Sequence, residues 1–129
     1  MTLEMRMLAW ACLLGIVQLL LADVFVTAQR GLKWNASARD VPQPPPSGVA
    51  GRLQRALHNF LETFPFFAAA VLAVALTRRG SEHTELAAQL YLWARVLYVP
   101  LYAAGIPYLR SLVWLASLWA ILQLLWALL

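Results

Sequence analysis

The sequence RLQRALHNFLETFPF, residues 52–66, places polar side chains at the start of an uncharged apolar segment that ends at Leu76. About 20 apolar residues are needed to cross the hydrocarbon core of a bilayer. Counting back from Thr77 therefore puts Asn59 and Glu62 inside a membrane-spanning helix. An ionisable group at that depth costs about 2.5 to 3.5 kcal/mol on insertion scales, so it usually faces a protein interior or a wet cavity and marks a functional site.

The composition of the chain is that of an integral membrane protein. Of its 129 residues, 62% are hydrophobic and only 12% are charged, which is unlike a soluble domain. Four apolar stretches are long enough to span a bilayer. Because lipid offers no partner to the backbone amides, we expect each stretch to be a helix. The sequence therefore predicts an all-α, up-and-down four-helix membrane bundle in one domain, residues 1–129, with helices over residues 3–28, 53–77, 85–106 and 109–129.

The distribution of lysine and arginine predicts the orientation of the chain. The first connection, residues 29–51, is rich in proline, and the chain between the first two helices holds four cations: Arg30, Lys33, Arg39 and Arg52. The second connection holds only two arginines, which two glutamates balance: Arg78, Arg79, Glu82 and Glu85. By the positive-inside rule the first connection is cytoplasmic. We therefore expect a multi-pass membrane protein with this loop on the cytoplasmic side.

The sequence disfavours several other classes of protein. A cleaved signal peptide is the competing interpretation of the first apolar stretch, but that stretch is long for one and contains Gln18 and Asp23. Cys12 is the single cysteine, which excludes an internal disulfide. The cations follow the loops without interleaved aromatic residues, which argues against a nucleic-acid partner. His58 has no second ligand at a suitable spacing, so we expect no metal.

Two of the predicted helices each carry a polar stripe along one face. In the second helix the stripe consists of Arg55, Asn59 and Glu62, at i, i+4 and i+7. In the third helix it consists of Tyr91, Arg95, Tyr98 and Tyr102. If the two helices run antiparallel through one bilayer, Tyr102 lies about as deep from the cytoplasmic side as Glu62. The two stripes can then meet near that side.

The stripes predict a cationic ligand pocket at the cytoplasmic end. Arg30 ends the first helix and Arg110 opens the fourth, so both add a cation there. Guanidinium groups pair bidentately with carboxylates, Glu62 can hold an ammonium group and Asn59 can bond an amide. This set suits a small anionic, peptide-like ligand.

A structural interpretation competes with the ligand pocket. Glu62 and Arg95 could neutralise each other as an ion pair, and Asn59 could join two helices by a hydrogen bond. We interpret Arg95 itself as a structural polar residue. A structural ion pair needs only two charges, and this end of the predicted bundle has six or more polar groups, so we expect a ligand site there.

The combined motif resembles that of a known family. Its parts are Arg55-x-x-x-Asn59-x-x-Glu62 in the second of four membrane helices, Arg95-x-x-Tyr98-x-x-x-Tyr102 in the third, and then Arg110. The pattern is similar to that of the membrane-associated proteins in eicosanoid and glutathione metabolism, the MAPEG family, over nearly the whole chain. Residues 98–110, YVPLYAAGIPYLR, look closer to the bacterial members. The resemblance thus implies a bacterial inner membrane as the location.

The resemblance also implies an assembly and a ligand. MAPEG proteins are homotrimers of four-helix subunits that hold glutathione, their co-substrate, between neighbouring subunits near the cytoplasmic side. Carried over one by one, the glutathione-binding residues would be Arg30, Arg55, Asn59, Glu62, Tyr98 and Tyr102. Arg110 would be the catalytic residue, because it resembles the arginine that stabilises the glutathione thiolate. A nearby cation favours thiolate over thiol, and the thiolate is the nucleophile.

These implications lead to a function and its alternatives. The leading hypothesis is a membrane glutathione transferase, with glutathione peroxidase activity as an extension, acting on a lipophilic electrophile from the bilayer. The alternative is a non-catalytic MAPEG-like protein that binds a lipid or a partner helix. A non-catalytic protein can lose the cation that activates the thiolate, so the presence of Arg110 favours an enzyme over a binding protein. A transporter or channel is a third option. The sequence argues against it, because it shows neither repeat symmetry nor pairs of broken helices.

Overall fold

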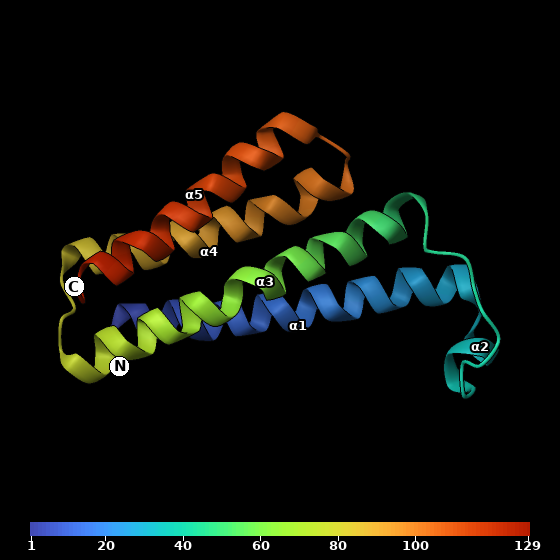
Figure 1. Cartoon of the computed structure of the whole chain (residues 1–129), viewed down its shortest axis with the longest axis horizontal. Coiled ribbons are helices and arrows are strands. Elements are labelled where there is room, and N and C mark those ends of the chain that lie inside the picture. Colours follow the sequence, from blue (N-terminus) through green and yellow to red (C-terminus); the bar gives the residue numbers. More distant parts are fainter.

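The chain folds entirely into helices. The computed structural model describes all 129 residues, and its elements are α1 (Leu3–Arg30), α2 (Leu32–Ala36), α3 (Gly48–Thr77), α4 (Glu82–Ala103) and α5 (Pro107–Trp126). Figure 1 shows α1 beside α3 and α4 beside α5, and these two pairs make the most extensive contacts. Both chain termini lie at one end of the molecule, and α2 with the long first connection lies at the other (Figure 1).

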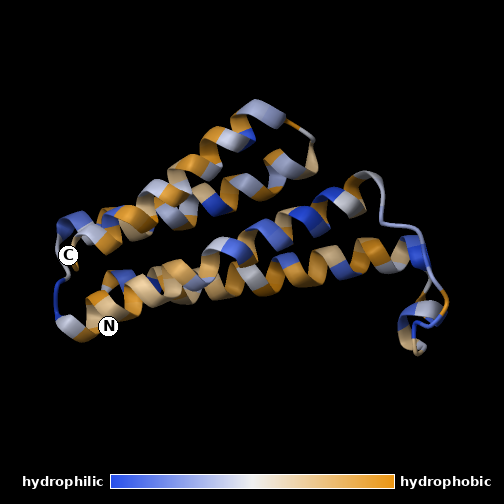
Figure 2. Ribbon diagram, in the orientation of Figure 1, coloured by the Kyte–Doolittle hydropathy of each residue, from blue (hydrophilic) through white to orange (hydrophobic).

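Three of the four long helices have the length and composition of membrane spans. These are α1, α3 and α5. The helix α4 is long enough, with 22 residues, but Gln89, Arg95 and its tyrosines make it more polar than the other three. The expectation of membrane-spanning helices is thus confirmed for three segments. Among the three spans, Figure 2 shows that α1 is mostly hydrophobic while polar residues gather in the first half of α3.

The helix ends differ from the predicted ones where glycine and proline set the backbone. The helix α3 begins at Gly48 rather than at residue 53, because the chain is still extended at Ser47 and turns into the helix at the next residue. The helix α4 ends at Ala103 rather than at 106, and Gly105 follows with a φ of 75°, a conformation that suits glycine. Pro107 then opens α5, where the missing amide proton costs nothing.

The first connection is more ordered than an irregular Pro-rich loop. It contains the short helix α2, which the sequence did not predict because five residues are too few to show a helical period. The helix α1 also continues to Arg30, beyond the predicted end at residue 28. Gln29 then ties this end of α1 to the start of α3: its Nε2 donates to the Ser47 carbonyl at 2.7 Å, and its Oε1 accepts from the Ser47 amide at 3.1 Å.

An aromatic contact in the core joins α3 to α4. The Phe67 ring stacks on the Tyr91 ring with centroids 3.9 Å apart, and neither side chain is exposed. The Tyr91 hydroxyl and the Thr63 hydroxyl are hydrogen-bonded at 3.0 Å. A tyrosine that the sequence suggested for the polar stripe is therefore a core residue, with its one polar atom satisfied from the neighbouring helix.

A buried carboxylate joins the start of α1 to the start of α4. Glu4 is only 3% exposed, and its Oε2 accepts a hydrogen bond of 3.2 Å from the Thr84 hydroxyl. Thr84 also forms a capping box with Ser81 at the start of α4. A Cβ atom at Gly80 would lie 2.7 Å from Glu4 Oε2, so a larger residue there would require the Glu4 carboxylate to shift. The contact brings the first turns of α1 and α4 together and makes these two helices run in the same direction.

The substitution Phe67→Ala tests the core contact. It leaves a cavity beside Tyr91, so the free energy of unfolding should fall by about 3 kcal/mol or more. Phe66→Ala is the matched control, because Phe66 is 64% exposed and its loss should change the free energy of unfolding by no more than about 0.5 kcal/mol. Denaturant titration of the detergent-solubilised protein measures both values. Equal losses would contradict the packing of this face.

Candidate functional site

A buried guanidinium links the two helices that carry the polar stripes. Arg95 is 1% exposed, and its Nη1 donates to Asn59 Oδ1 at 3.0 Å. Its guanidinium carbon also lies 4.2 Å from the Tyr98 ring centroid and 5.7 Å from that of Phe60. Its Nε and Nη2 atoms are buried without a hydrogen-bond partner. The ring faces and the single amide oxygen therefore provide the contacts that compensate this charge.

A cationic recess lies near the start of α3, beside the turn between α4 and α5. Its volume is about 230 Å³, and its lining consists of Arg52, Arg55, Tyr102, Gly105, Pro107 and Arg110. Arg52 Nε donates to the carbonyl of Ala103 at 2.9 Å, which fixes the base of the turn. Three guanidinium groups thus surround one small space, and such a space favours an anion.

Tyr102 lies at the centre of this recess. Arg55 Nε donates to the Tyr102 hydroxyl at 3.3 Å, and the Arg55 guanidinium lies 5.9 Å from the ring centroid. The Arg110 guanidinium lies 4.5 Å from the same centroid. These contacts are to a ring and a hydroxyl, with no carboxylate among them. The two guanidinium groups therefore keep hydrogen-bond donors available for a ligand.

The structure brings together only part of the predicted set of site residues. Arg55, Tyr102 and Arg110 line one recess, and Tyr98 lies next to it, buried, with its ring edge-on to the Tyr102 ring at 5.6 Å. Asn59 is half-buried against Arg95.

Glu62 makes no hydrogen bond with Arg95. Its side chain is exposed, although it lies on the same helical face as Arg55. The hydrogen bond of Arg95 is to Asn59. The structural alternative, a Glu62–Arg95 ion pair, is therefore not formed within this chain. The exposed carboxylate of Glu62 therefore remains available to a group outside this chain.

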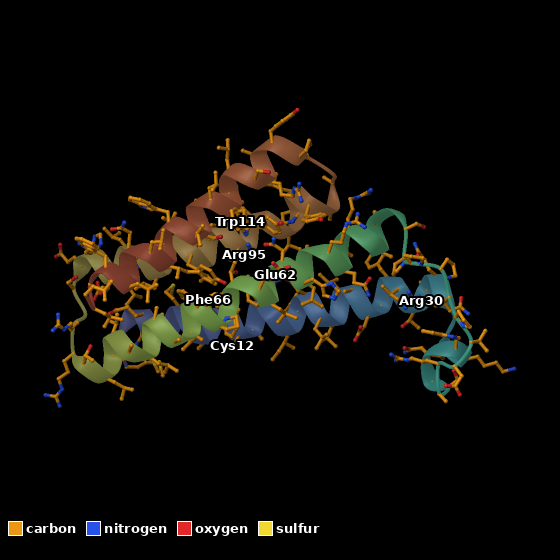
Figure 3. The ribbon with its side chains drawn as sticks, viewed as in Figure 1. Cys12, Arg30, Glu62, Phe66, Arg95 and Trp114 are labelled. Atoms are coloured by element: carbon orange, nitrogen blue, oxygen red, sulfur yellow. The ribbon has the colours of Figure 1, made fainter.

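Arg30 does not line the recess. Its Nη2 donates to the carbonyl of Pro44 at 3.3 Å, and its guanidinium lies 5.1 Å from the Trp34 ring centroid. In Figure 3, Arg30 lies at the end of the molecule beside α2, whereas Arg95 lies between α3 and α4. Within one chain, the first-helix arginine belongs to the loop and not to the cationic recess.

Comparison of the whole sequence with protein families identifies the family of this chain. The sequence model described as the MAPEG family matches residues 7–129, which is nearly the whole chain. The chain belongs to the MAPEG family. No curated protein sequence matches it closely enough to count as a relative. The expected family is thus confirmed, and with it the assignment to membrane-associated proteins.

Two residues of this MAPEG chain were missed by the sequence patterns. Arg52 reads as a loop charge when the helix is thought to begin at residue 53, but in a helix that starts at Gly48 it lies one turn before Arg55 and on the same face. Gln18 is 3% exposed in α1, and both polar atoms of its side chain lack a partner. A glutamine in the middle of an apolar run is a signal that could have identified this position.

A second recess in the MAPEG chain is apolar. It lies between α1 and α4, has a volume of about 460 Å³ and is lined by Met7, Trp10, Leu13, Leu14, Val17, Gln89, Leu92, Trp93 and Val96. This recess is larger than the cationic one but holds no ionisable group, so it cannot activate a nucleophile. We therefore assign the candidate chemistry to the cationic recess.

The contact between Asn59 and Arg95 predicts a coupling between the two residues. Asn59→Leu removes the hydrogen bond to a buried guanidinium, so the free energy of unfolding should fall by about 2 to 3 kcal/mol. In the double variant with Arg95→Met, the loss should be at least about 1.5 kcal/mol less than the sum of the two single losses. His58→Leu, at an exposed neighbouring position, is the control. A coupling of zero would contradict the assignment of this bond.

Proposed function

We propose that the chain is a membrane glutathione transferase that conjugates or reduces a lipophilic electrophile. The observation that carries the proposal is Tyr102 held between the guanidinium groups of Arg55 and Arg110, in a recess with no carboxylate in its lining. Glutathione carries two carboxylates and one ammonium group, so arginines and one glutamate match its charges. Membership of the MAPEG family supports the same ligand class.

The recess is too small to hold the whole tripeptide, which supports a binding site that one chain forms only in part. Small-molecule sites usually have volumes of about 300 to 1,000 Å³, whereas this recess has about 230 Å³. It suits one charged end of the tripeptide. The remainder would extend along the exposed face of α3, where Glu62 can hold the ammonium group. The other wall would then come from a neighbouring subunit, as in the homotrimer that the family resemblance implies.

In the proposed assembly α4 also crosses the membrane, which makes each subunit a four-helix bundle. Its buried Arg95 would be shielded from lipid by α3 and by its own aromatic neighbours. The first connection, with its excess of cations, would face the cytoplasm. The membrane would be the inner membrane of a bacterium, as the resemblance of residues 98–110 to bacterial members implies.

Arg110 would supply the chemistry of the transferase. A cation beside the glutathione sulfur lowers the pKa of the thiol, whose proton leaves to solvent. The thiolate then attacks the electrophilic carbon, a C–S bond forms, and the leaving group departs with its electron pair. With a lipophilic hydroperoxide, two glutathione molecules would be oxidised to the disulfide, while the peroxide O–O bond breaks to give an alcohol and water.

A non-catalytic MAPEG-like protein is the second candidate function. The apolar recess between α1 and α4 favours it, since that recess would suit a lipid chain or a partner helix without any reaction. In that case the arginines would bind an anionic group only. Turnover with a general aryl halide separates the two candidates, because a binding protein would bind glutathione and form no conjugate.

Arg110→Ala tests the proposed catalytic role. Loss of the cation should lower kcat/KM for conjugation by about 100-fold or more, the cost of removing one stabiliser of developing charge. It should also raise the pKa of the bound thiol, so the remaining activity should increase toward alkaline pH. Arg78→Ala, at the end of the molecule where Met1 and Glu4 lie, should leave both properties unchanged. An unaltered rate in Arg110→Ala would refute the assignment.

Glu62→Gln tests the proposed binding role of the second-helix stripe. Glutathione affinity should fall by about tenfold or more, because a charge-assisted bond to the ammonium group is lost. Glu82→Gln is the matched control, since Glu82 is also exposed but lies at the start of α4, near the chain termini. Calorimetric titration measures both affinities. An unchanged affinity in Glu62→Gln would show that the stripe is not the binding face.

A further inference from the structure

The first connection is organised around a single tryptophan. The Trp34 ring lies between two guanidinium groups, with Arg30 5.1 Å and Arg39 5.6 Å from its centroid. Its indole Nε1 donates to the carbonyl of Val41 at 2.7 Å. The indole thus contacts three separate points of the loop, and these contacts give the segment a defined shape.

Local hydrogen bonds fix the rest of this segment, residues 31–41, which we name the α2 hook. Gly31 has a φ of 93°, and this conformation turns the chain sharply out of α1. The Ser37 hydroxyl donates to the Trp34 carbonyl at 2.6 Å and accepts from the Arg39 amide at 3.1 Å. Arg39 donates to the backbone and side-chain oxygens of Asn35 through Nε and Nη2, which leaves Nη1 without an intramolecular partner.

The α2 hook presents cations and apolar side chains together. Lys33 is exposed, and Leu32 and Val41 are 74% and 65% exposed. With Arg30 at its base, the segment holds three cations against one carboxylate, Asp40. Large apolar groups that stay exposed next to cations and a tryptophan are typical of a segment lying in a membrane interface.

The position of the α2 hook determines which partner can reach it. It follows directly on α1, a 28-residue helix that is apolar enough to cross a membrane, so it emerges at the level of the lipid headgroups. Juxtamembrane cations attract anionic lipids at that level. A soluble anion could pair with Lys33 and Arg39 but would leave Leu32 and Val41 in water.

We propose that the α2 hook is a binding site for anionic phospholipid headgroups. Lys33 and the free Nη1 of Arg39 pair with the phosphate, while Leu32 and Val41 enter the interfacial region beside α1. The site is separate from the cationic recess, because none of the residues that line that recess belongs to the hook. The hook thus holds the start of the first connection on the membrane surface.

Native mass spectrometry of the full-length protein in detergent tests this proposal. Titration with phosphatidylglycerol and with phosphatidylcholine gives the affinity of the first bound lipid for each headgroup. The unaltered protein should prefer phosphatidylglycerol, and Lys33→Gln should lower that preference by about fivefold, the effect of one interfacial cation. The double variant Lys33→Gln, Arg39→Gln should lower it by a further factor of about five.

The variant Arg78→Gln, Arg79→Gln is the matched control, because it removes two cations from the opposite connection. It should retain the lipid preference. Lys33→Gln alone decides the outcome if Arg39→Gln disturbs the hook, since the Lys33 side chain makes no hydrogen bond within the chain. Glutathione affinity should be the same in all these variants, so failure here is distinguishable from failure of the proposed function.

Three results would overturn the proposal. The first is an equal affinity of the unaltered protein for both lipids. The second is an equal loss of preference in the Arg78→Gln, Arg79→Gln control. The third is competition by water-soluble glycerol phosphate at the concentrations at which the lipid binds, which would assign the cations to a soluble anion.

Discussion

The hydrogen bond between Arg95 and Asn59 is the contact on which the arrangement of the polar residues depends. It buries a guanidinium between α3 and α4, where a charge without compensating contacts would be costly. The aromatic faces of Phe60 and Tyr98 surround the charge, so both helices are held in one rotational position. In that position Arg55 of α3 and Tyr102 of α4 meet at the end of the molecule.

The cationic recess follows from this rotation and from the turn after α4. Gly105 and Pro107 reverse the chain within a few residues, and the reversal brings Arg110 of α5 over the Tyr102 ring. Three helices therefore each contribute to one small space: arginines from α3 and α5, and a tyrosine from α4. The charges in the recess are of one sign, which is a costly arrangement unless an anion binds there. This cost is the physical reason for assigning the recess to a ligand.

Sequence patterns predicted the faces of the helices but not the partners of each side chain. The spacing of Arg55, Asn59 and Glu62 predicts one shared face, yet the structure separates their environments: Asn59 contacts Arg95, while Glu62 is exposed. Helical period determines only the direction of a side chain from its own axis. How two helices are rotated against each other depends on contacts between them, here the bond from Arg95 to Asn59 and the stacking of Phe67 on Tyr91, and the sequence of one helix does not specify such contacts.

The loop and the helix ends were the least predictable parts, also for physical reasons. The α2 hook depends on contacts between the indole of Trp34 and two arginines on either side of it in sequence, and such contacts have no period. They also draw Arg30 away from the recess that the family resemblance implies for it. The start of α3 at Gly48 is determined by local backbone geometry and by the bonds between Gln29 and Ser47. The position of Arg30 and the start of α3 were therefore both mispredicted because they depend on side-chain contacts across the loop.

The most direct measurement of the central claim is a cryo-electron microscopy structure of the full-length protein in lipid nanodiscs with glutathione at saturating concentration. The account predicts density for the tripeptide at the cationic recess, with a carboxylate in hydrogen-bond distance of Arg55 and the sulfur beside Arg110. Glutathione density at the opposite end, near Glu4 and Arg78, or an empty recess at saturation, would contradict it.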